Sequence, residues 1–140
     1  MLRYLELLVK WNARMNLTVV GDERQIVQRH FGESLAVAEW ILREVGSEGR
    51  LFDLGAGAGF PGAPIAVRCP GWQVTLIESQ KKKATFLREM VRVVELSNCS
   101  VFAGRAEEMK EKADVVSMRA VDRSGDMLEV ARRMLVPRGT

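Results

Sequence analysis

The amino-acid sequence predicts an α/β fold in which a helical N-terminal segment precedes a parallel β-sheet. Residues 1–49 carry apolar side chains at helical spacing, whereas residues 50–140 alternate short apolar runs with helical patterns. Strands that alternate with helices form parallel sheets with right-handed crossovers. The chain has 140 residues, of which 47% are hydrophobic and 28% charged, so we expect a folded core rather than a disordered chain.

Three helical stretches are expected before residue 50. The first has one apolar stripe at steps of four, three and four, formed by Tyr4, Leu8, Trp11 and Met15. Asp22 and Gln25 resemble a capping box that opens the second stretch, which Gly32 interrupts. The third stretch carries the apolar residues Leu35, Ala38, Ile41, Leu42 and Val45. Residues 46–49 then form a linker with no helix or strand preference.

Four strands are expected after the linker, because short apolar and β-branched runs recur there. They are residues 51–54, 74–77, 101–103 and 113–118. A short helix with Pro64 near its first turn follows the first strand, and longer helices are expected around residues 86–94 and 128–135.

Composition excludes several classes of protein. No apolar run approaches the ~18 residues that a membrane span needs, and Glu6 and Lys10 interrupt any signal-peptide core. Cys69 and Cys99 are isolated and His30 is the single histidine, so we expect no metal site and two reduced thiols in a cytoplasmic protein. The net charge of +3 suits a nucleic-acid partner without requiring one.

The segment of residues 53–62 is the richest in chemistry. Gly57, Gly59 and Gly62 match G-x-G-x-x-G directly after a predicted strand, and Glu78 ends the next strand. A carboxylate at that place accepts hydrogen bonds from both hydroxyls of a ribose. We therefore expect a ligand that contains a nucleoside; the alternative is a structural turn with a surface glutamate.

S-adenosylmethionine suits this segment better than a dinucleotide. Pro61 and Pro64 remove two backbone donors near the helix start, where a pyrophosphate would bind. Asp53 adds a negative charge that disfavours phosphate and favours a cationic ligand with an amino group. This order of strand, glycine loop and second acid is that of class I methyltransferases, and a nicotinamide-dependent oxidoreductase is the alternative.

The whole chain resembles the bacterial glucose-inhibited-division B type (RsmG/GidB) family, which methylates N-7 of a guanine in small-subunit (16S) ribosomal RNA. The matching segments run in order along the chain: residues 4–12, 15–18, 29–30, 34–35, 53–64, 76–79, 82–83, 86–87, 104–108 and 117–121. The Phe60-Pro61-Gly62 step is absent from most other methyltransferases.

The resemblance implies the functional residues. Cofactor contacts would be Asp53, Gly55, Gly57, Gly59, Phe60, Glu78, Ala106, Glu107 and Arg119. Glu78 would bind the ribose, and the backbone at Ala106 and Glu107 would lie beside the adenine. Arg119 has a structural alternative, an ion pair with Asp53 or Glu107. From their charge rather than from the resemblance, Arg29, Lys82, Lys83 and Arg123 are expected to contact RNA phosphates, and His30 is a further candidate for contact with RNA. For His30 the alternative is a role in packing, and for the lysines the alternative is a solvated start of a helix.

The resemblance also implies the strand order 3-2-1-4 in a Rossmann-like sheet, with residues 1–49 packed on a core of residues 50–140. Relative to the family, Gly32-Glu33 replaces a larger apolar residue and Asp, and the chain ends before the last strands. We expect a monomeric full-length family member. In this chain the fourth strand becomes an edge, which favours self-association and leaves an inactive cofactor- or RNA-binding fragment as an alternative.

Overall fold

The computed structural model describes residues 6–7, 10, 26–118 and 124–137. In chain order the elements are η1 (Ile26–Phe31), α3 (Gly32–Glu44), β1 (Gly49–Leu54), α4 (Gly62–Arg68), β2 (Trp72–Glu78), α5 (Lys81–Val94), β3 (Cys99–Ala103), η2 (Ala106–Glu108), β4 (Val115–Met118) and α6 (Ser124–Met134). The predicted stripe of Tyr4, Leu8, Trp11 and Met15 and the predicted cap at Asp22 lie outside the described residues.

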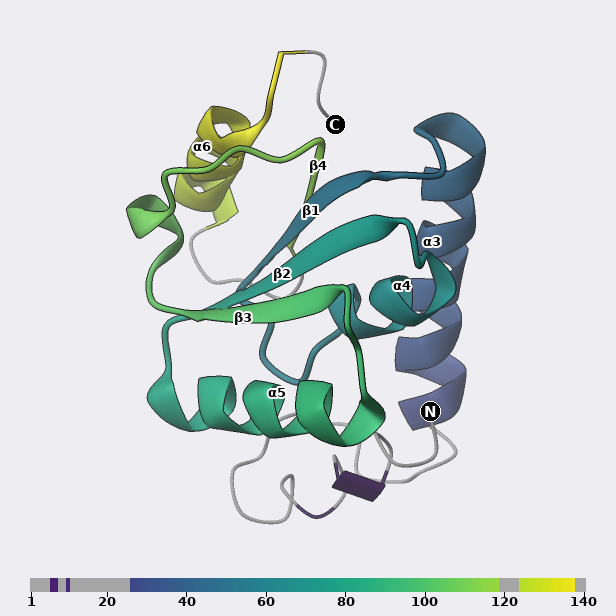
Figure 1. Ribbon diagram of the computed structural model, residues 1–140. Helices are drawn as coiled ribbons and strands as arrows, with labels where there is room; N and C mark the ends of the chain where they lie inside the picture. The colour runs from purple at the N-terminus through teal and green to yellow at the C-terminus, as the bar shows by residue number, and fades with distance from the viewer. Residues whose placement is uncertain (1–5, 8–9, 11–25, 119–123, 138–140) are drawn as a thin grey trace.

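The four strands form one parallel sheet in the order β3-β2-β1-β4, as predicted (Figure 1). The central strand β1 pairs with β2 from Gly49 opposite Trp72 to Leu54 opposite Ile77. It pairs with β4 from Leu51 opposite Val115 onward. Because all four strands run in one direction, the loops that follow β1, β2 and β3 meet at one edge of the sheet.

Helices cover both faces of the sheet, because the strands are apolar on both sides. On one face, Leu51 and Leu76 belong to a core cluster that includes Ile41 of α3, Ile65 of α4 and Phe86 of α5. On the other face the apolar strand residues Phe52, Leu54 and Ile77 form a second cluster with Ala131 and Met134 of α6. The alternation within residues 51–54 thus distributes one strand between two cores.

The predicted interruption at Gly32 is wrong. The π-helical turn η1 runs directly into α3, with Gly32 as the first residue of the α-helix. A glycine costs a helix only about 1 kcal/mol relative to alanine, and burial of Ala38 and Ile41 on the same helix exceeds that cost. A Cβ at Gly32 would meet nothing within 4 Å, so its lack of a side chain serves no packing requirement.

Candidate functional site

The glycine loop after β1 has a left-handed backbone at three positions. The φ angles are 63° at Gly55, 55° at Gly57 and 97° at Gly59, a region that residues with side chains seldom adopt. The loop is tied to β2, since the Ala56 N–H donates to the Ile77 carbonyl at 3.1 Å. These glycines therefore let the chain turn sharply while it stays against the carboxyl end of β2.

Two glycines of the motif have opposite surroundings. A Cβ at Gly57 would meet only the Gly55 carbonyl oxygen at 3.8 Å, so the space above this backbone is open. A Cβ at Gly62 would collide with the Leu76 side chain and lie 2.7 Å from a carboxylate oxygen of Asp53. Gly62 thus permits close packing of α4 on the sheet, whereas Gly57 leaves room for a ligand to approach the main chain.

Glu78 braces the loop from the end of β2. Its side chain is buried, with Oε1 accepting from the Gly57 N–H at 2.8 Å and Oε2 accepting from the Gln80 N–H at 3.0 Å. An ionised carboxylate offers about four lone-pair sites, so two remain after these bonds. The Glu78 carbonyl also accepts from the Gly104 N–H at 3.0 Å, which joins the β3 end to the same edge.

Asp53 lies beneath the loop and is fully buried. Its Oδ2 accepts from the Gly62 N–H at 3.0 Å, and its Oδ1 accepts from the Ser117 hydroxyl at 3.1 Å. Asp53 therefore holds the start of α4 and the strand β4 at once. Ser117 was not predicted as a site residue; its signal is the register of β1 with β4, which sets it opposite Asp53.

The predicted residues Phe60 and His30 lie together. The His30 ring stacks on the Phe60 ring with centroids 4.8 Å apart and planes 18° apart, and Phe31 meets Phe60 edge-on at 5.0 Å. Phe60 and Phe31 are buried in the first core cluster, and the Phe60–Pro61 peptide bond is cis. The η1 turn therefore forms one wall of the glycine loop. The neighbouring Arg29 is exposed.

The remaining predicted residues divide by position. Ala106 is buried and Glu107 exposed in η2, which follows β3 at the same sheet edge as Glu78. Lys82 and Lys83 lie in the first turn of α5, directly after the end of β2. Arg119 and Arg123 lie outside the described residues.

The two cysteines of the described part of the chain are unsuited to nucleophilic chemistry. Within that part, no group of three or more His, Cys, Asp or Glu side chains is placed to hold a metal ion. Both cysteines are buried, and burial raises the pKa of Cys69 and raises that of Cys99 to about 12, so neither is a thiolate nucleophile at neutral pH. None of the described helices is both long and apolar enough to cross a membrane.

Comparisons with known proteins agree on one family. A family model described as rRNA small subunit methyltransferase G matches residues 1–140. Curated proteins of that name are similar to this chain: 43% identity over 99% of it in Stenotrophomonas maltophilia, and 45% over all of it in Xanthomonas euvesicatoria. The chain spans 64–65% of the length of these relatives.

Solved structures of other proteins share the fold. Trm5b from Pyrococcus abyssi superposes with a TM-score of 0.65 at 21% identity, covering 77% of this chain and 31% of that one. TYW2 from M. jannaschii in complex with AdoMet has a TM-score of 0.62 at 20% identity, covering 73% and 48%. At these identities the likeness shows the fold alone.

Proposed function

Because the chain belongs to the rRNA small subunit methyltransferase G family, we propose that it binds S-adenosylmethionine at the carboxyl edge of its sheet. As part of the protein that carries it, the chain would serve methyl transfer to N-7 of a guanine in small-subunit ribosomal RNA. The observation that carries this proposal is the placement of the Glu78 carboxylate beside the open main chain of Gly57, at the end of β2.

This edge fits the parts of S-adenosylmethionine. The two unused lone-pair sites of Glu78 match the two hydroxyls of a ribose. The open space above Gly57 admits the ligand close to the backbone. Ala106 opens the short η2 turn, so its N–H has no partner within that turn and suits the adenine edge. Gly55, Gly59 and Phe60 would shape the loop around the ligand, and Arg119 would complete the predicted set.

A dinucleotide suits the same edge less well. In a dinucleotide site the pyrophosphate takes the N–H groups at the start of the helix that follows the loop. Here the Gly62 N–H donates to the Asp53 carboxylate, and Pro61 and Pro64 have no N–H to offer. The buried Asp53 charge would also repel a phosphate. These features support a ligand without phosphate.

The proposed reaction asks little acid–base chemistry of the protein. The sulfonium of the cofactor supplies an electrophilic methyl group, and guanine N-7 carries a lone pair and no proton. No general base is therefore required, in keeping with a chain whose single histidine stacks on Phe60. Catalysis would come from holding donor and acceptor in near-attack geometry, an effect worth up to about 7–11 kcal/mol in favourable cases.

Basic residues near the edge would position the RNA. Lys82 and Lys83 stand at the first turn of α5, where cations are disfavoured by the helix dipole, so helix stability does not explain them. Exposed Arg29 directly precedes His30, whose ring stacks on Phe60. With Arg123, these side chains would contact phosphates, which fix register without reading sequence.

Calorimetry with S-adenosylhomocysteine and with NAD tests the cofactor. We expect binding of the first and none of the second; the reverse result would favour the oxidoreductase reading. Transfer of a labelled methyl group to in vitro transcribed small-subunit rRNA, followed by mapping of N-7 methylguanine, tests the reaction. Cofactor and RNA binding without transfer would support the alternative of a binding unit that does not turn over by itself.

A further inference from the structure

A cleft of about 230 Å³ lies on the face of the molecule opposite α5. One wall is the connection that leads from η2 to β4, and the other is the C-terminal half of α6. Lys110 and Lys112 line the first wall, Arg133 lines the second, and Met109 and Met134 form an apolar floor. Residues more than twenty positions apart in sequence thus bring three cationic side chains to one hollow.

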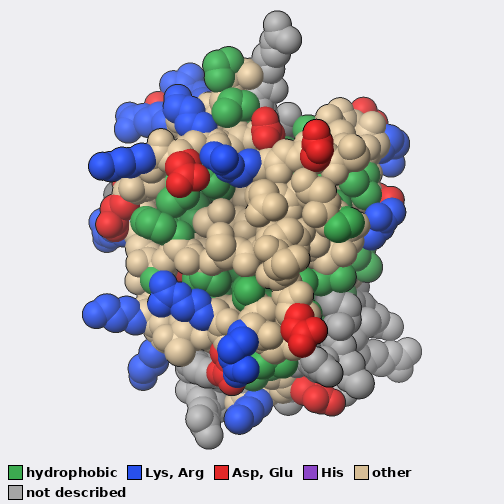
Figure 2. Space-filling model, viewed as in Figure 1, with side chains coloured by type: hydrophobic (Ala, Val, Ile, Leu, Met, Phe, Trp, Pro, Cys, Tyr) green, Lys and Arg blue, Asp and Glu red, His purple; other side chains and the backbone are tan. Residues whose placement is uncertain are grey.

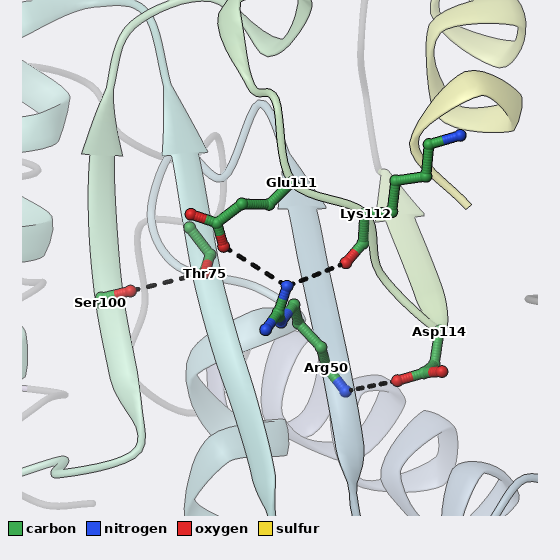
Figure 3. Close-up of polar contacts among 6 residues, drawn as sticks. All are labelled: Arg50, Thr75, Ser100, Glu111, Lys112 and Asp114. Carbon is green, nitrogen blue, oxygen red and sulfur yellow. Dashed lines mark hydrogen bonds and ion pairs between the residues drawn. The ribbon is translucent and has the colours of Figure 1, made fainter. Parts of the chain in front are cut away.

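The two lysines of the cleft carry charge that the described residues do not neutralise. Within the described ranges, neither Lys110 nor Lys112 has a carboxylate within ion-pairing distance. The intervening Glu111 also lines the cleft, and its Oε2 lies 3.4 Å from an Arg50 nitrogen at the start of β1. Figure 3 shows this arrangement, with the Lys112 ammonium on the side of α6 and the Glu111 carboxylate directed back to Arg50.

The α6 wall is also basic. Glu129 lies 3.1 Å from Arg132 and 3.5 Å from Arg133, so one carboxylate faces two guanidinium groups. Hydrogen bonding from Arg132 is the main reason that the pKa of Glu129 is lowered. Figure 2 shows Lys and Arg side chains gathered at the upper left of the molecule, where Figure 1 draws α6 and η2. Three cationic side chains, Lys110, Lys112 and Arg133, outnumber the two carboxylates that line the cleft, Glu107 and Glu111, and Glu111 is paired with Arg50, so the cleft favours anions.

We propose that this cleft binds a phosphodiester of the RNA substrate, with Lys110, Lys112 and Arg133 as its cationic contacts. The inference rests on the proposed function and adds a surface to it. Phosphodiester groups are recognised by converging lysines and arginines, and such contacts orient RNA without reading its bases. The exposed rim and the hollow of about 230 Å³ suit a backbone segment rather than an enclosed metabolite.

The cleft is adjacent to the proposed cofactor edge. Ala106 and Glu107, whose main chain is predicted to lie beside the adenine, line its η2 end. RNA held in the cleft would therefore pass over η2 toward the ends of β2 and β3. Together with Lys82 and Lys83 on the other side of that edge, the cleft would give the RNA two separate points of attachment.

The test compares two variants that each remove two positive charges. Lys110→Gln/Lys112→Gln changes the cleft, and Arg88→Gln/Arg92→Gln changes exposed positions of α5, on the opposite face of the sheet. All four positions are exposed, and the bond from Arg50 to the Lys112 carbonyl is to main chain, so both variants should fold. Affinity for in vitro transcribed small-subunit rRNA is measured from 50 to 300 mM salt, and S-adenosylhomocysteine binding by calorimetry.

For the lysine variant, we expect the slope of log K against log salt concentration to become shallower by about 1.4–1.8, which is the contribution of two phosphate contacts. This variant should keep wild-type cofactor affinity, and the arginine variant should keep the wild-type slope. If the slope is unchanged in the lysine variant, or falls equally in both variants, the proposal that the cleft binds RNA is overturned while the proposed function remains intact. A wild-type chain that binds neither cofactor nor rRNA overturns both.

Discussion

Replacement of Glu78 by glutamine tests the proposed ribose contact without removing the side chain. In the wild type, the carboxylate accepts from the Gly57 and Gln80 N–H groups at 2.8 and 3.0 Å. Glutamine keeps one oxygen and presents an NH₂ group to one of these donors. The variant therefore loses one main-chain bond and half of the acceptor sites left for the ribose.

The expected effect follows from the strength of hydrogen bonds to charged groups, about 1.5–3 kcal/mol each. Loss of one ribose bond should weaken S-adenosylhomocysteine binding at least tenfold, which corresponds to about 1.4 kcal/mol. The free energy of unfolding should fall by about 1–3 kcal/mol, because a main-chain N–H in a partly buried hydrogen bond is left facing another donor. Calorimetry gives the first quantity and urea unfolding the second.

A matched control and a modified ligand separate ribose binding from loop bracing. Glu108→Gln makes the same chemical change at an exposed carboxylate that accepts from the Arg105 N–H at 2.9 Å, and it should leave affinity unchanged. S-adenosylhomocysteine that lacks the 3′-hydroxyl should bind wild type less well but bind Glu78→Gln as the parent ligand does. If Glu78→Gln binds S-adenosylhomocysteine with a dissociation constant within about twofold of wild type, the ribose contact is refuted. If the substitution weakens the binding of both ligands equally, Glu78 only holds the glycine loop in place.

Three further results are expected. Gly57→Ala should abolish cofactor binding but destabilise the fold by only about 1–2 kcal/mol, because φ at this position is 55° while the added Cβ would have room. The control Gly46→Ala, also at positive φ and with nothing within 4 Å of its Cβ, should retain cofactor binding in the same titration. Asn98→Asp should lower the free energy of unfolding by about 2–5 kcal/mol, since the Asn98 amide donates to the Ala66, Cys69 and Trp72 carbonyls and a carboxylate would face three acceptors; a urea midpoint like that of wild type would contradict this. Burial raises the pKa of Cys99 from 9.0 to about 12, so the folded state keeps the thiol proton to higher pH than the unfolded state does. The free energy of unfolding should therefore fall as pH rises from about 9 to 12, by at most about 1.4 kcal/mol per pH unit. Cys99→Ala should show a shallower fall over this range, and identical pH profiles of the variant and the wild type would count against the argument.

The sheet could be predicted because its information is local. Each strand is a short apolar run between turn residues, and the acid that ends β2 stands where the spacing from the glycine loop sets it. The order 3-2-1-4 followed from the family resemblance and is confirmed. The break expected at Gly32 failed because tertiary packing of α3 outweighs a small propensity cost.

The contacts within the site were less accessible to sequence reasoning. His30 and Phe60 are thirty residues apart, and no periodic pattern links a π-helical turn to a loop after a strand. Asp53 was predicted from its charge as part of a ligand site, yet the structure shows both of its oxygens bonded within the protein. Such partners depend on which strands become neighbours, and this emerges only when the sheet is assembled.

The double attachment of Asp53 has a consequence for the order of assembly. The loop's exit is tied to Asp53 within nine residues, but the second tie, from Ser117, spans 64 residues. During synthesis, β1, β2 and β3 can associate while Asp53 still lacks this bond. Contacts of such long range form late, because chain closure must precede them. The loop would therefore acquire its final shape only when β4 docks, so that a nascent chain becomes competent for ligand when β4 has joined the sheet rather than when β1 has formed.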